Sequence, residues 1–182
     1  KQHMECYTTG DRTMTSIIKV DTLQKANGAT PTAADLGINT TGTVLQVVRS
    51  TFTAAHNTTS STSFSSMGSP FNLAITPKFS NSIILIDIML NPYISGNSHT
   101  GVYNIHNGSG QLGHASNGFG IVPPTGGSNG QYRHFNINAS DTASSTSTIT
   151  YQVYHRSDNA GVTFYGNHAN LTNHIRLTEI AG

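Results

Sequence analysis

Two segments of the chain alternate between apolar and polar residues with the period of a β-strand. They are residues 145–154, Ser-Thr-Ser-Thr-Ile-Thr-Tyr-Gln-Val-Tyr, and residues 174–182, His-Ile-Arg-Leu-Thr-Glu-Ile-Ala-Gly. Successive side chains of a strand point to opposite faces of a sheet, so this period predicts strands that bury one face. The pattern commits these segments to β structure, and further strands are expected wherever it recurs.

Shorter segments of the same kind are separated along the chain by Gly, Asn, Pro and Ser. We expect strands at residues 16–24, 43–54, 62–66, 71–76, 82–90, 99–106, 131–138, 148–156, 162–165 and 174–180. Residues 82–90 are apolar on both faces, which is typical of a central strand covered on each side. Only residues 33–36 fit a single helical turn, with Thr32 as its N-cap. The sequence therefore predicts an all-β protein, a jelly-roll-like antiparallel β-sandwich.

A turn-rich stretch separates a short N-terminal part from a main domain. Asn27-Gly28 and Thr30-Pro31 mark turns in a linker that runs to about Gly42. We expect residues 14–42 to form an extended segment for attachment or oligomerisation, and residues 43–182 to form the head domain. Residues 1–13 are either a non-native or upstream segment or the native start, since Met14 begins a more natural opening. They contain no apolar stretch of a secretory signal peptide.

The composition favours recognition over catalysis. Ser, Thr, Asn and Gly account for 80 of the 182 residues, whereas Lys and Arg number nine and Asp and Glu eight. A net charge of +1 gives no electrostatic basis for binding nucleic acid or an anionic membrane. The longest apolar run, residues 83–90, is too short to cross a membrane. The apolar share of 35% is low for a compact domain, which favours an oligomer whose copies cover one another.

The main domain offers few groups for catalysis or metal binding. A glycosidase needs two carboxylates that flank the scissile bond, and Asp87 with Glu179 is the only conceivable pair. That pair requires a trimer to bring the two carboxylates together, and Glu179 more readily forms a structural ion pair with Arg176. Eight histidines lie in this domain, but no two have the spacing that places ligands on one face of a strand or helical turn. One alternative stays open. In a trimer, a single histidine on the three-fold axis would supply three metal ligands, one from each chain. We expect no catalytic residues, no cofactor and no metal.

Two long breaks between the expected strands, residues 107–130 and 157–173, carry the candidate binding residues. Amides and hydroxyls hydrogen-bond to sugar hydroxyls, and aromatic rings stack on the apolar faces of sugars. Asn and Gly in these breaks could instead serve only as turn formers. The candidates are Asn107, Gln111, His114, Asn117 and Phe119 in the first break, and Tyr165, Asn167, His168 and Asn170 in or beside the second.

The order of several short motifs resembles a family of small tail-fibre-like, receptor-binding proteins of marine phages. The motifs are Ile-Ile-Lys-Val-Asp-Thr-Leu-Gln at 17–24, Gly-Thr-Val-Leu-Gln-Val-Val at 42–48, Thr-Ser-Ser-Thr-Ser-Phe at 59–64, residues 73–77 with 82–86, residues 146–153, and the ending at 174–182. The resemblance covers nearly everything from Met14 onward. The histidine-rich loops between Gly96 and Asn138 depart from the common pattern. Because the motifs lie in expected scaffold strands, no individual binding residue is carried over.

This resemblance implies a homotrimeric virion protein that is made in the host cytoplasm. Its N-terminal segment would attach to other virion proteins, and its jelly-roll head would bind a glycan or protein of the host surface. Two alternatives remain: a capsid-decorating or filament-forming structural protein without a ligand, and a tailspike-type depolymerase. The shortage of carboxylates speaks against the depolymerase, so we expect a protein that is not an enzyme.

Overall fold

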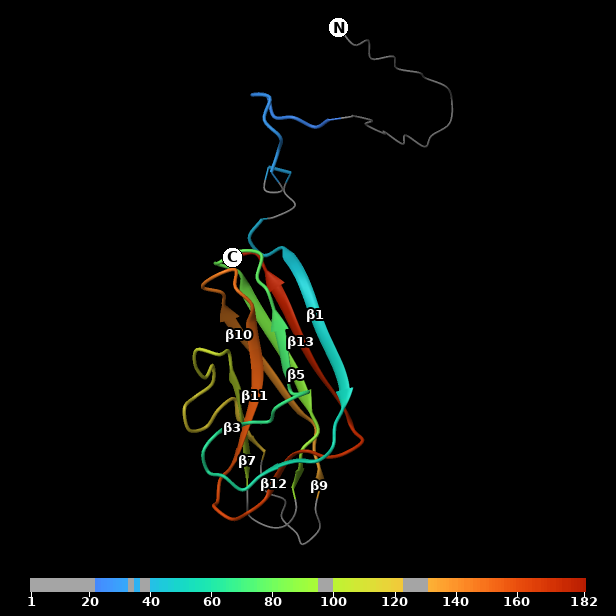
Figure 1. Cartoon of the computed structure of the whole chain (residues 1–182), viewed down its shortest axis with the longest axis vertical. Helices are drawn as coiled ribbons and strands as arrows, with labels where there is room; N and C mark the ends of the chain where they lie inside the picture. The colour runs from blue at the N-terminus through green and yellow to red at the C-terminus, as the bar shows by residue number, and fades with distance from the viewer. Residues whose placement is uncertain (1–21, 33–34, 37–39, 95–99, 123–130) are drawn as a thin grey trace, which may run out of the picture. The chain divides into compact units, whose positions relative to one another are not determined.

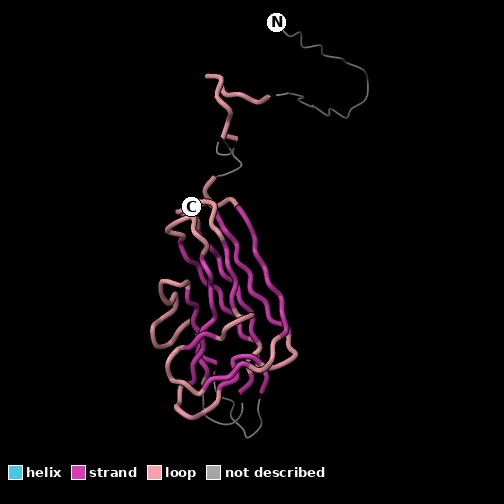
Figure 2. The backbone as a smooth tube through the Cα atoms, viewed as in Figure 1, coloured by secondary structure: helices cyan, strands magenta, loops and turns pink. Residues whose placement is uncertain are grey.

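The computed structural model describes residues 22–32, 35–36, 40–94, 100–122 and 131–182. The chain divides into two compact units, Lys1–Ile38 and Asn39–Gly182, and we call the second unit the head. The described residues contain no helix, and their strands form antiparallel sheets (Figure 2). Among them there is thus no helix of the length and apolarity needed to cross a membrane. The prediction of an all-β, β-sandwich-like protein is confirmed.

The strands of the head range from two to ten residues, and the five longest belong to the two larger sheets. They are β1 (Val44–Thr53), β2 (Asn57–Thr59), β3 (Ser65–Ser66), β4 (Asn72–Ile75), β5 (Ile83–Leu90), β6 (Tyr93–Ile94), β7 (Gly101–His106), β8 (Gly120–Val122), β9 (Gln131–Tyr132), β10 (Phe135–Thr142), β11 (Ile149–Ser157), β12 (Phe164–Asn167) and β13 (Thr172–Ile180).

Two larger sheets and a small one make up the head (Figure 1). The first sheet has the strand order β1-β13-β5-β10, and the second has the order β3-β11-β7-β8 with β4 also paired to β11. The small sheet, in the order β2-β12-β6-β9, lies at the end of the head opposite to the C-terminus and to the start of β1. We call this end the distal end.

The core lies between the inner faces of the two larger sheets. The period-two pattern of β5 buries every second residue, and the same holds for β11 and β13. Burial of such side chains stabilises the fold by about 1.5–3 kcal/mol each. The central residues of the core are Ile84, Ile86, Ile88 and Leu90 of β5, Ile175 and Leu177 of β13, Tyr103 and Ile105 of β7, and Tyr151 and Val153 of β11.

The outer face of the first sheet carries exposed apolar side chains. Ile83 and Leu85 of β5 are each 37% exposed, and Val44 and Val47 of β1 are each 55% exposed. Strand β13 separates β1 from β5, and the register places Val44 and Ile83 on either side of Ile180. We call Val44, Val47, Ile83 and Leu85 the outer patch. The prediction that residues 82–90 are covered on both faces is therefore wrong for a single chain.

Several short or shifted strands differ from the prediction. Strand β10 spans Phe135–Thr142 rather than residues 131–138, because Gln131–Tyr132 instead forms β9 of the small sheet. Strands β2, β6 and β8 were not predicted. Of the expected strand at 16–24, residues 16–21 lie outside the described residues, and residues 22–24 form no strand.

The expected N-cap at Thr32 is present in the first unit. Its hydroxyl lies 2.6 Å from Asp35 Oδ2 and accepts a hydrogen bond from the Asp35 amide, while the Thr32 amide donates to the same carboxylate. This reciprocal arrangement satisfies amides at the start of a turn. Hydrogen bonds from Lys25 and Thr32 hold the pKa of Asp35 below its usual value. Residues 33–34 lie outside the described part.

Candidate ligand-binding site

Three tyrosines form one row across the small distal sheet. Tyr165 of β12 pairs with Tyr93 of β6, which in turn pairs with Tyr132 of β9. The ring centroids of Tyr93 and Tyr165 are 5.6 Å apart, and those of Tyr93 and Tyr132 are 5.2 Å apart. Cross-strand aromatic pairs at this separation attract one another through their quadrupoles. The register of three short strands thus gathers rings from distant parts of the sequence.

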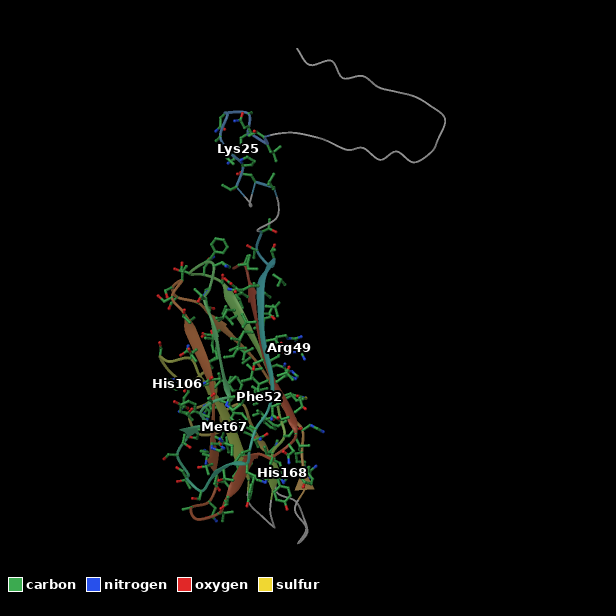
Figure 3. The ribbon with its side chains drawn as sticks, turned by 45° about the vertical axis from the view of Figure 1, so that its right-hand side comes forward. Lys25, Arg49, Phe52, Met67, His106 and His168 are labelled. Carbon is green, nitrogen blue, oxygen red and sulfur yellow. The ribbon has the colours of Figure 1, made fainter. Side chains whose placement is uncertain are left out.

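Two histidines extend this row. His56 precedes β2 and His168 follows β12, and their ring centroids are 4.3 Å apart. The His168 ring also lies 4.6 Å from that of Tyr132, and His56 lies 5.6 Å from Tyr165. We call His56, Tyr93, Tyr132, Tyr165 and His168 the ring cluster. Figure 3 shows His168 at the distal end of the head.

Backbone hydrogen bonds fix the chain segments that carry the ring cluster. The His168 amide donates to the Asn91 carbonyl at 2.9 Å, and the Arg133 amide donates to the Pro92 carbonyl at 3.0 Å. The Asn91 side chain is buried and donates to the Thr172 carbonyl at 2.7 Å. Buried amides that are satisfied in this way rigidify the surrounding backbone. The rings therefore lie on a preorganised surface.

A pocket of about 320 Å³ opens beside the ring cluster. Tyr132 is 60% exposed and forms part of the pocket wall. Concave, mostly apolar sites with a few polar groups are typical of small-ligand binding. The lining residues are Asn91, Tyr132, Arg133, His134, His168, Ala169 and Leu171.

The predicted binding residues of the second break have different surroundings in the structure. Tyr165 and His168 are half-buried members of the ring cluster. Asn167 is fully buried and donates to the Ala55 carbonyl at 3.2 Å, so it supports the site from within. Asn170 is exposed with a φ of 66°, a left-handed conformation that asparagine tolerates in turns.

The predicted binding residues of the first break lie elsewhere on the head. Asn107 accepts hydrogen bonds from the amides of Ser109 and Gly110, and His114 Nδ1 lies 3.1 Å from the amides of Ser116 and Asn117. These contacts form tight turns. Figure 3 places His106, the last residue of β7 before this break, nearer the middle of the head than His168.

Three further side chains of the first break have distinct surroundings. Gln111 accepts a hydrogen bond from Asn104 at 2.9 Å and lines a separate pocket with Phe64 and Arg156. Phe119 is half-buried and packs against the core. Asn117 is exposed. The two sets of predicted residues thus belong to different surfaces, and only the second set contributes rings to the ring cluster.

Several residues of the distal site are not among the predicted binding residues. His56, Tyr93, Tyr132, Arg133 and His134 lie in or beside strands of two or three residues. Such strands show no period, and the pairing of β6 and β9 with β12 cannot be derived from their composition. The sequence signal that could have indicated this site is local. It is the run Tyr132-Arg133-His134, which has three large polar side chains.

Two of the four carboxylates of the head point to opposite faces of the first sheet. Asp87 lies on the outer face, where Arg176 Nη2 approaches its Oδ2 to 2.8 Å. Glu179 is buried on the inner side and accepts hydrogen bonds from the Ser82 hydroxyl and the Lys78 amide, each at 2.6 Å. The expected Glu179–Arg176 pair is therefore wrong. Within one chain, Asp87 and Glu179 do not flank a common cleft.

The pKa of Glu179 reflects two opposing effects. Burial by itself raises the pKa, since it disfavours the charged form. Hydrogen bonds from Ser82 and Gln46 and from the amides of Lys78 and Phe79 stabilise the carboxylate and prevail, so the pKa lies below its usual value. Glu179 is thus a charged structural residue that ties β13 to the segments around it.

The described residues include no group of three or more His, Cys, Asp or Glu side chains arranged to hold a metal ion. Comparison of the sequence with models of known families and with curated proteins gives no match.

Proposed function

We propose that the head is a recognition module that binds a carbohydrate of a host cell surface through the ring cluster and the adjacent pocket. The observation that carries this proposal is the Tyr165–Tyr93–Tyr132 row, which presents the exposed ring of Tyr132 on the distal sheet. Tyrosine offers a large apolar face together with a hydroxyl, and it loses little conformational entropy when a ligand binds.

Removal of the exposed ring tests this proposal. Tyr132→Ala should abolish most binding to a glycan array or to host cells, because the ring forms the open wall of the pocket. The fold should lose only about 1 kcal/mol, since Tyr132 contacts other rings at the surface rather than the core. Tyr154→Ala is the matched control, because Tyr154 stacks on His106 outside the distal site. Equal binding by both variants would contradict the proposal.

The wider setting of the proposal is a virion protein of the tail-fibre type. In this setting the head adopts a jelly-roll-like topology, and residues 14–42 attach the protein to other virion components. The motif order described above supports this assignment. Electron microscopy of particles labelled with an antibody against the head would locate the protein, and labelling of the capsid surface instead of the tail would favour the decoration alternative.

The proposed assembly is a homotrimer whose copies cover the outer patch. Its four side chains are large, apolar and between 37% and 55% exposed. The net charge of the chain is only +1, so electrostatic repulsion between copies is weak. Exposed apolar side chains gathered on one face of a domain commonly mark an interface.

Hydrolysis has no part in the proposed function. The separation of Asp87 and Glu179 by the first sheet supports binding without cleavage. Release of reducing ends from host polysaccharide by the wild-type protein would contradict this proposal, provided that Asp87→Asn or Glu179→Gln abolishes the release.

A further inference from the structure

We infer that the distal pocket selects an acidic sugar, with the carboxylate of the ligand held by Arg133. The inference rests on the proposed function and names the class of ligand. Arg133 lines the pocket together with His134 and His168, so all its ionisable groups other than Tyr132 carry or can accept positive charge. The ring of Tyr132 supplies an apolar wall for the body of a sugar.

The distribution of negative charge supports this inference. The head has four carboxylates, and none of them lines the pocket. Asp87 is paired with Arg176, Asp141 accepts hydrogen bonds from Asn107 and Tyr151, and Glu179 is buried against Ser82. No other acidic residue occurs between Asp35 and the end of the chain except Asp158, in the turn after β11. An anionic ligand therefore meets no opposing carboxylate at this site.

Arg133 differs in its surroundings from Arg156, the arginine that lines the pocket near Gln111. Arg133 is exposed, and its guanidinium makes no ion pair with any residue that the structure describes. The guanidinium of Arg156 instead donates to the Ser116 carbonyl at 2.6 Å and lies 5.4 Å from the centre of the Phe64 ring. A guanidinium donates two parallel hydrogen bonds to a carboxylate, which gives both affinity and orientation.

The pocket volume sets the size of the ligand. At about 320 Å³ it lies near the lower end of the range for small-molecule sites, roughly 300–1,000 Å³. It therefore accommodates a terminal sugar residue rather than a long run of a polysaccharide. A terminal sialic or uronic acid combines the required carboxylate with an apolar ring face.

Calorimetric titration with matched ligands tests the inference. The probes are oligosaccharides ending in sialic acid or glucuronic acid, their methyl esters, and a sulfated analogue. We expect the acids to bind about ten-fold more tightly than the esters, the factor typical of one charge-assisted hydrogen-bonded contact. Binding of the acids should weaken several-fold as salt rises from about 0.05 M to about 0.5 M, since screening shortens the range of the attraction.

Variants of Arg133 test whether this side chain causes the preference for acids over esters. Arg133→Gln should bind acids and esters equally weakly, and Arg133→Lys should retain part of the preference because it keeps the charge but loses the planar fork. Arg49→Gln, at another exposed arginine on β1, should behave as the wild type. A preserved melting temperature would show that Arg133→Gln is folded.

The outcomes separate this inference from the proposed function. If the wild type binds esters and acids equally, or prefers the sulfated analogue, the selection of a carboxylate is wrong, while carbohydrate binding stands. If Arg133→Gln retains the preference, the assignment to Arg133 is wrong. If the wild type binds no saccharide on the array, the proposed function itself fails.

Discussion

Acidification from about pH 7.5 to about pH 5 should destabilise the head through one histidine, His155. This residue lies on β11 with only 2% of its surface exposed, and its Nδ1 atom has no hydrogen-bond partner among the residues that the structure describes. A Cβ placed on Gly166 would lie 2.3 Å from that atom, so the ring is tightly enclosed. Burial lowers the pKa of His155 to about 4.

The direction of the effect follows from the two states of the chain. In the unfolded chain His155 titrates with a pKa near 6.5, so at pH 5 the unfolded state binds a proton that the folded state does not. Stability is therefore present above the unfolded pKa and is lost as the pH falls from about 6.5 toward 4. At about pH 5 the loss amounts to about 2 kcal/mol, from roughly 1.36 kcal/mol per pKa unit.

Urea denaturation monitored by circular dichroism, at a fixed protein concentration and a series of pH values, measures this loss. A change of about 2 kcal/mol is a substantial part of the 5–15 kcal/mol typical of a domain. The pKa of Glu179 is lowered from 4.5, so the stability that this residue contributes is lost only below that value. The interval between about pH 5 and pH 7 therefore reports on histidine rather than on Glu179.

Two variants decide whether His155 is responsible. His155→Phe replaces the ring with one of similar size that cannot titrate, and it should remove most of the pH dependence. His134→Gln, at an exposed histidine, should leave the dependence unchanged. The reasoning is refuted if His155→Phe keeps the full slope between about pH 5 and pH 7, or if the wild type shows no slope.

Three other perturbations address packing, buried charge and assembly. Glu179→Gln should cost about 1–3 kcal/mol in urea denaturation, because the carboxylate accepts hydrogen bonds from Ser82 and Lys78; an unchanged midpoint would contradict its role. Gly101→Ala should cost about 1–3 kcal/mol, since the added Cβ would lie 2.0 Å from the Phe164 ring. Gly110→Ala serves as the control, because its Cβ would meet no atom of the described residues within 4 Å. Val47→Ser with Leu85→Ser should convert the proposed trimer to single chains by light scattering, because it removes apolar area from the outer patch; a wild-type mass of one chain would contradict the assembly.

Sequence periodicity was sufficient for two of the long strands of the head, β11 and β13. The alternation at residues 148–156 and 174–180 corresponds to β11 and β13, which cover Ile149–Ser157 and Thr172–Ile180. These strands bury one face along their whole length, so burial imposes a period of two on their residues. The core could therefore be predicted in outline.

The distal site could be predicted only in part. Tyr165 and His168 were identified because they lie beside a long break, but Tyr93 and Tyr132 lie on strands of two residues. Those strands exist because β6 and β9 pair in register with β12, and this pairing depends on the completed fold. Phe119 is the opposite case. It was predicted to contact a ligand because it lies in a polar loop, but its ring packs against the core. Composition alone does not distinguish an exposed ring from a packed one.

The antiparallel pairing of β1 with β13 also determines how the head would respond to mechanical load. Strand β1 enters the head at the end opposite to the ring cluster and pairs with β13 from Val44 to Thr53 (Figure 1). If the distal end holds a receptor while the preceding chain is anchored, tension acts along these strands. Hydrogen bonds of an antiparallel ladder lie perpendicular to the strands, so such tension shears them together instead of opening them one by one. The head would therefore resist unfolding under such tension more strongly than its equilibrium stability suggests.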